Sequence, residues 1–218
     1  YARTLDTAAA EVRRALPLAP LRPKVILTIP YPWDVRWVPG TSWGNLTGRA
    51  LDFGSNADRA AAVAWWVDEA ISLWHAANLS HIELGGFYWL VEGLGHDSKA
   101  TLDSRLIPMV AEHIHSRPEG LTFTWCPGFE EVYNAQASAE VGFHDGIRGA
   151  FHWEELGFDL AVLQPNYMLG NKTMSHWEDV ANSTQRFGLG VEMELGFGTT
   201  NAYCDRVSAA TACHHAVV

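Results

Sequence analysis

Short apolar runs alternate with longer amphipathic stretches along most of the chain. The first run, residues 24–29, is rich in β-branched residues and ends at a proline, which is typical of a strand buried on both faces. The stretches between such runs carry apolar residues at helical spacing. The pattern predicts strands at 24–29, 81–89, 121–126, 160–164 and 189–195, and helices at 6–16, 57–77, 104–116, 146–156 and 175–187.

This alternation of buried strands and helices implies a parallel sheet, either open and doubly wound or closed as a barrel. A nucleotide-binding open sheet usually has a glycine-rich turn after its first strand, and no such motif follows residue 29. The pattern therefore favours an α/β fold of the (β/α) TIM-barrel type, as a single domain over residues 1–218. A complete barrel has eight strands and about 250 residues. We therefore expect either a fragment of a longer enzyme or a sheet closed in a way that the pattern does not reveal.

Composition removes several classes of function. The net charge of -10 argues against a nucleic-acid partner, which requires a basic surface. No run of about 20 apolar residues is present to span a membrane. The three cysteines show no CxxC spacing, and no HExxH motif occurs, so we expect neither a metal site nor a cofactor. Cys204 and Cys213 are spaced so that they can either pair or stay free.

The last predicted strand carries the strongest chemical signal. Side chains alternate along a strand, so Glu192 and Glu194 point to the same face, away from the helix layer. Buried carboxylates are costly unless they are paired or used. One interpretation is a hydrogen-bonded structural pair, and the other is an acid, base or nucleophile.

Polar and aromatic residues also follow the other strands, where ligands bind in parallel α/β folds. Glu92 follows the second strand among aromatic residues, where it is either a solvated loop residue or a second catalytic carboxyl. Two carboxylates beside aromatic rings suit glycoside hydrolysis, because one protonates the leaving oxygen and the other attacks or activates water. For Trp65, Trp66 and Trp74 we prefer helix packing to binding. The candidate substrate-binding residues are Trp33, Asp34, Trp37, Tyr88, Trp89, Trp125, Gln164, Asn166 and Tyr167.

Four runs carry a family resemblance: residues 24–32 (KVILTIPYP), 86–89 (GFYW) with Glu92, 163–167 (LQPNY) and 190–194 (GVEME). They resemble the bacterial domain-of-unknown-function family 4855, from about Ala8 to Leu195. The resemblance implies a TIM-barrel relative of the glycoside hydrolases on secreted or surface proteins. It implies a sugar-directed site near Glu92, Gln164, Asn166, Glu192 and Glu194.

The leading hypothesis is an extracellular or cell-surface O-glycosyl hydrolase that acts on a polysaccharide or glycan. In it, Glu194 is the nucleophile or general base, Glu92 is the general acid, and Glu192 orients the site or binds a hydroxyl. The spacing of the carboxyls decides between retention and inversion of the anomeric carbon. A second hypothesis is a non-catalytic carbohydrate-binding domain on a degenerate barrel. A third is a metal-dependent hydrolase or lyase, against which the missing ligand spacing counts.

Overall fold

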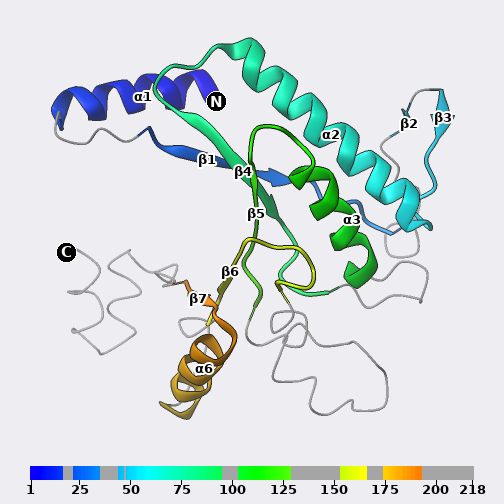
Figure 1. Cartoon of the computed structure of the whole chain (residues 1–218), viewed down its shortest axis with the longest axis vertical. Coiled ribbons are helices and arrows are strands. Elements are labelled where there is room, and N and C mark those ends of the chain that lie inside the picture. Colours follow the sequence, from blue (N-terminus) through cyan, green and yellow to red (C-terminus); the bar gives the residue numbers. More distant parts are fainter. Residues whose placement is uncertain are drawn as a thin grey trace, which may run out of the picture.

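Helices and strands alternate through most of the chain, as Figure 1 shows for the computed structural model. The structure describes residues 1–16, 22–34, 44–46, 48–94, 103–128, 153–165 and 174–192. The helices are α1 (Ala2–Ala15), α2 (Asn56–Ala77), α3 (Asp103–His115) and α6 (Met174–Phe187). The strands are β1 (Lys24–Ile29), β2 (Asn45–Leu46), β3 (Arg49–Ala50), β4 (Glu83–Trp89), β5 (Thr122–Trp125), β6 (Leu160–Leu163) and β7 (Gly190–Val191).

Five of these strands form one parallel sheet in the order β1-β4-β5-β6-β7. Each strand lies beside the next sheet strand along the chain, so every connection steps in the same direction. In a doubly wound sheet that direction reverses part of the way across. The short strands β2 and β3 pair separately with each other, in antiparallel fashion, between β1 and α2. Over the described residues the sheet is therefore singly wound.

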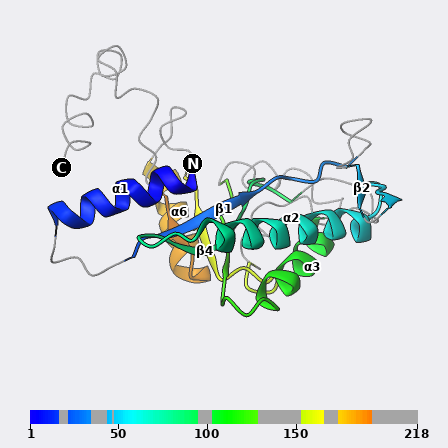
Figure 2. The same ribbon diagram turned by 90° about the horizontal axis from the view of Figure 1, so that it is seen from above.

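One face of the sheet carries large apolar side chains that pack under the helices. Alternation along the strands puts Phe87 and Trp89 of β4 on this face together with Phe123 and Trp125 of β5, and all four are fully buried. Helices α2 and α3 lie side by side over these rings (Figures 1 and 2). The aliphatic residues of the two helices in this core are Val63, Val67, Ile71, Leu106, Ile107, Val110, Ala111 and Ile114.

Helix α6 covers the far end of the same face. Ala161 of β6 is aligned with Trp125 of β5, and it packs with Leu163 against Val180 of α6. Three helices on one face are the arrangement that a singly wound sheet requires, because right-handed crossovers that step in one direction all fall on one side. The layers are thus a sheet and one helical layer.

The opposite face of the sheet is more polar and more open. The parallel register aligns Thr28, Tyr88 and Thr124 on this face. Two apolar side chains on it remain 40% exposed (Ile26) and 48% exposed (Leu160). Helices α2, α3 and α6 all lie on the other side, so this face is available to carry the side chains of a site.

Helix α1 packs outside this core. None of its residues is buried, and the Asp6 carboxylate oxygen Oδ1 accepts hydrogen bonds from the backbone N–H groups of His81 (2.6 Å) and Ile82 (3.1 Å). Those two bonds tie the helix to the segment that enters β4. In the described part of the chain, no helix is both long enough and apolar enough to cross a membrane.

The predicted α/β class with a parallel sheet is confirmed, but the described strands form an open sheet and no closed barrel. The predicted helix over 146–156 is wrong in its described part, because residues 153–157 form a turn. Gly157 adopts a φ of +89° there, and a Cβ at that position would lie 2.6 Å from the Ala111 side chain. A left-handed glycine pressed against α3 ends any helix at this point. Residues 146–152 and 193–195 lie outside the described residues.

Candidate active site

All five parallel strands end at the same edge of the sheet, called here the carboxyl edge. The register aligns Ile29 with Trp89 and Trp89 with Trp125, so the segments that follow β1, β4 and β5 emerge next to one another. Backbone hydrogen bonds extend this alignment beyond the strands. Gly128 N–H donates to the Glu92 carbonyl (3.1 Å), and Glu192 N–H donates to the Leu163 carbonyl (2.9 Å). The loops that carry the candidate residues are therefore held together by the backbone.

The centre of this edge is a tyrosine and a cysteine from neighbouring strands. Tyr88 lies on the open face of β4, and its hydroxyl donates a hydrogen bond to the sulfur of Cys126, which directly follows β5. Burial raises the pKa of the Tyr88 hydroxyl far above its usual value, and the neighbouring Cys126 adds to this. Burial also raises the pKa of the Cys126 thiol. Both groups are therefore neutral near pH 7.

Two carboxylates converge on this pair from different strands. Glu192, directly after β7, and Glu92, three residues after β4, each raise the pKa of both Tyr88 and Cys126 by their negative charge. Such coupling requires the carboxylates to lie near the pair. Both glutamates are also exposed to solvent. Two of the three predicted catalytic residues thus act electrostatically on the same Tyr88–Cys126 pair, and Glu194 lies outside the described residues.

Gln164 joins the same cluster from the end of β6. Its side-chain Nε2 donates to the carbonyl of Cys126 (3.0 Å), and its backbone N–H donates to the carbonyl of Pro127 (2.9 Å). The amide therefore fixes the Cys126 segment and remains half-buried beside it. Among the other predicted binding residues, Trp37, Asn166 and Tyr167 lie outside the described residues.

Two tryptophans predicted for the groove belong to the core instead. Trp89 and Trp125 are fully buried on the helix-covered face, one position out of phase with Tyr88 and Cys126. Trp125 Nε1 donates to the carbonyl of Val91 (2.7 Å), which shows that its polar atom serves the fold. A ring that water does not reach offers no face to a sugar, so the prediction for these two residues is corrected. The preference for packing is supported for Trp66, which contacts Phe87, whereas Trp65 is 45% exposed.

A buried charged network, absent from the sequence predictions, supports the first loop of the edge. Arg59 of α2 donates to Asp103 of α3 (3.1 Å), and these side chains are 1% and 0% exposed. Tyr31 donates to the other carboxylate oxygen of Asp103 (2.7 Å) and accepts a hydrogen bond from Arg59 (3.0 Å). Arg59 Nε also donates to the carbonyl of Pro32 (2.7 Å). Burial raises the pKa of Tyr31, so this hydroxyl stays protonated.

This network fixes the segment that directly precedes Trp33. The indole of Trp33 is 48% exposed and meets the ring of Tyr31 edge-on, with the ring centroids 4.8 Å apart. The next residue, Asp34, is buried at 2% exposure. Trp33, Trp89 and Trp125 are the described tryptophans among the four predicted for the groove. Of these three, Trp33 alone presents its ring to solvent at the carboxyl edge.

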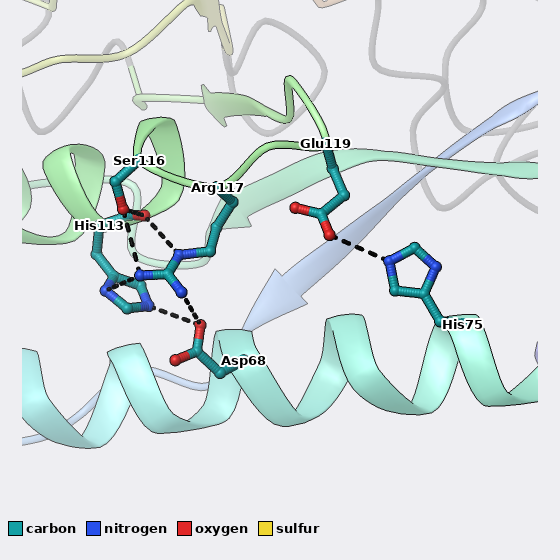
Figure 3. Close-up of polar contacts among 6 residues, drawn as sticks. All are labelled: Asp68, His75, His113, Ser116, Arg117 and Glu119. Carbon is teal, nitrogen blue, oxygen red and sulfur yellow. Dashed lines mark hydrogen bonds and ion pairs between the residues drawn. The ribbon is translucent and has the colours of Figure 1, made fainter.

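A second set of polar residues lies away from the strand ends, on α2 and on the end of α3 (Figure 3). His113 contacts Asp68 at 2.9 Å, Arg117 contacts the same carboxylate at 3.4 Å, and His75 contacts Glu119 at 3.1 Å. The hydrogen bond from His75 lowers the pKa of the Glu119 carboxyl. Across the residues that the structure describes, no group of three or more His, Cys, Asp or Glu side chains is arranged to hold a metal ion.

A singly wound parallel α/β domain with paired acidic residues at its carboxyl edge is the class that the fold and this site define. Within that class, the chain belongs to the family described as "Domain of unknown function (DUF4855)", whose sequence model matches residues 2–214. The match confirms the resemblance found in the sequence and extends it to both ends. Neither a curated protein nor a solved structure matches the chain significantly.

Proposed function

We propose that the carboxyl edge is the active site of a glycoside hydrolase that cleaves O-glycosidic bonds of a polysaccharide or glycan. The observation that carries the proposal is that Glu92 and Glu192, which follow two different strands, both raise the pKa of Tyr88 and of Cys126 by their negative charge. Glycoside hydrolysis requires two carboxyl groups that flank one scissile bond. Two segments at the carboxyl edge that each carry a carboxylate support the proposal.

In this proposal each residue at the carboxyl edge has a separate catalytic or binding role. Glu92 protonates the leaving oxygen, and Glu194, two residues beyond Glu192 in the sequence, is the nucleophile or general base. Glu192 orients the site or binds a sugar hydroxyl. The protonated Tyr88 hydroxyl and the Gln164 amide offer hydrogen-bonding groups beside the carboxylates, and the exposed Trp33 ring offers an apolar surface for a pyranose face.

A (β/α)-barrel architecture is proposed from the order of the strands and the placement of the helices. The sequential strand order and the three helices on one face support a (β/α)-barrel type of architecture, because an open doubly wound sheet carries helices on both faces. Active sites of such barrels lie at the carboxyl ends of the strands. An extracellular or cell-surface location is proposed from the family resemblance.

A second candidate is a carbohydrate-binding domain without turnover. It is favoured by the exposure of both Glu92 and Glu192. Catalytic carboxyls usually have a pKa perturbed by burial or by close neighbours, whereas carboxylates that bind hydroxyls need no such shielding. The two candidates share a saccharide ligand and differ in whether a bond is broken.

The test is a turnover assay on a panel of polysaccharides with the variants Glu92→Gln, Glu192→Gln and Glu194→Gln. We expect Glu92→Gln and Glu194→Gln to lower kcat by at least about a hundredfold, the usual loss when an acid or base is removed. Glu112→Gln, an exposed glutamate on α3, is the matched control and leaves kcat unchanged. Near-wild-type turnover in both Glu92→Gln and Glu194→Gln would contradict the proposal. Saccharide binding without turnover in the parent chain would select the second candidate.

A further inference from the structure

A pocket of about 420 Å³ opens at the opposite, amino edge of the sheet. It lies between the end of α2, the start of β4 and the segment that enters β5, and its volume is in the range of small-molecule sites. Glu83 and Trp89 mark the two ends of β4, six residue steps apart, which corresponds to about 20 Å. The pocket is therefore separate from the carboxyl edge.

The charged groups that line this pocket already have partners within the protein. His75 contacts Glu119 at 3.1 Å, and Lys24 contacts Glu83 at 3.7 Å. Arg22 donates to the carbonyls at the entry to β4, one of them that of Ile82 at 2.9 Å. Two formal positive charges face two negative ones, so an ionic ligand gains no net attraction. A neutral ligand with several hydroxyl groups finds both donors and acceptors.

An aromatic side chain completes the lining. Trp74 lies next to His75 in the last turn of α2 and is half-buried in the pocket wall. Figure 3 shows His75 directed from α2 toward Glu119, which lies in the segment before β5. The lining therefore combines the apolar surface of an indole with a carboxylate and an imidazole that contact each other. This combination matches the amphipathic surface of a sugar ring, which has apolar faces and a polar rim.

We propose that the amino-edge pocket is a second binding site, for a neutral saccharide unit. Trp74 packs against the face of the sugar ring, and Glu119 with His75 bonds its hydroxyl groups. Only the choice of a saccharide as the ligand rests on the proposed function. A chain that acts on a glycan can contact the same polymer at both edges of the sheet. Binding at the amino edge anchors the polymer and requires no bond cleavage.

The experiment measures binding of neutral hexasaccharides of glucose, xylose, mannose and N-acetylglucosamine to the whole chain. The readouts are calorimetry and the indole N–H signal of Trp74 in NMR spectra, assigned with Trp74→Phe. We expect at least one sugar to shift this signal. We also expect Trp74→Ala and Glu119→Gln each to weaken its binding about tenfold or more. Trp65→Ala, an exposed tryptophan of the same helix, and Glu112→Gln are the matched controls and keep full affinity.

Glu119→Gln keeps the volume of the side chain, so it tests the pocket even if Trp74→Ala unfolds. The absence of any shift of the Trp74 signal at about 10 mM sugar would overturn the proposal. Sugar binding that survives Glu119→Gln but is lost in Glu92→Gln would also overturn it, because the ligand then occupies the carboxyl edge. A hexagalacturonate that binds more tightly than every neutral sugar contradicts the neutral class. Failure of the catalytic proposal is distinguished from failure of this binding proposal by the turnover assay, in which it gives unchanged turnover in Glu92→Gln and Glu194→Gln.

Discussion

The two edges of the sheet hold charged groups in opposite ways. At the carboxyl edge, Arg59 and Asp103 form an ion pair whose side chains are 1% and 0% exposed, and hydrogen bonds to Tyr31 surround it. At the amino edge, His75 and Glu119 form a pair whose side chains are 63% and 24% exposed. Burial of an ion pair is costly and depends on every partner being present, whereas an exposed pair contributes little. The carboxyl edge is therefore rigidly specified, and the amino edge tolerates change.

The largest effect that this comparison predicts is the loss of one member of the buried pair. Asp103→Ala leaves the Arg59 guanidinium buried without its counter-charge, and we expect the free energy of unfolding to fall by about 3–5 kcal/mol. Urea denaturation measures the change. The double replacement of Arg59 by Met and Asp103 by Leu removes both charges and is expected to restore much of the loss. If Asp103→Ala lowers the free energy of unfolding by less than about 1 kcal/mol, the buried ion pair is no more important for stability than the exposed pair at the amino edge.

A smaller loss is expected from the hydroxyl that bridges the pair. Tyr31→Phe keeps the ring but deletes the hydrogen bonds to Asp103 and from Arg59. We expect the free energy of unfolding to fall by about 1–2 kcal/mol, since buried partners are left unsatisfied. Tyr1→Phe, at a fully exposed tyrosine, is the control for the substitution itself. If the two variants unfold alike, the network does not stabilise the edge.

The reactivity of Cys126 tests the approach of the carboxylates. Burial first and Glu192 next raise the pKa of this thiol, so Glu192→Gln lowers that pKa and increases the thiolate fraction at pH 8. We expect alkylation to become faster, because the thiolate is the reacting form of cysteine. Tyr88→Phe removes a hydrogen bond that lowers the pKa, so it slows the reaction.

Stopped-flow labelling with a maleimide measures both rates. The measurement is made with Cys204 and Cys213 replaced by serine, which leaves Cys126 as the sole thiol of the three in the chain. Glu112→Gln serves as the distant control. Equal rates in Glu192→Gln and Glu112→Gln would place the carboxylate away from the thiol.

The smallest effect is expected at the amino edge and depends on pH. The hydrogen bond from His75 lowers the pKa of the Glu119 carboxyl below its usual value of 4.5, so the pair stabilises the folded state above that pH. The contribution disappears as the pH falls through the lowered pKa. At pH 7, His75→Ala is expected to lower the free energy of unfolding by less than about 1 kcal/mol. Thermal unfolding of parent and variant at pH 7 and pH 3 checks this, and a difference that grows toward pH 3 contradicts the sign.

Parts of the site were predictable because they depend on strand ends alone. Tyr88, Glu92, Gln164 and Glu192 were each assigned from their place at the end of an apolar run, and the structure places all four at the carboxyl edge. Cys126 is the last residue of the predicted strand 121–126, but the sequence does not indicate its contact with Tyr88, because that contact joins two strands. No local pattern reports such a contact.

The two residues of the buried ion pair are recognisable in the sequence by their spacing from apolar residues. Arg59 falls in helical register with the buried Val63 and Val67, and Asp103 with the buried Ile107 and Ala111. A charged residue within an apolar stripe must be paired, so two such residues on neighbouring helices indicate a buried bridge. The pairing itself, at a separation of 44 residues, depends on how the two helices pack.

By itself, the sequence determined where the five strands of the main sheet and helices α1, α2, α3 and α6 lie, that those strands run parallel, and which polar residues follow them. These properties depend on residues that are neighbours along the chain, through periodicity and turn chemistry. It did not determine which face of β4 and β5 is covered, since residues 87–89 place aromatic rings on both faces. That choice depends on where α2 and α3 cross the sheet. Packing of these distant segments buried Trp89 and Trp125 and left Tyr88 beside Cys126, because burial is a property of the assembled layers.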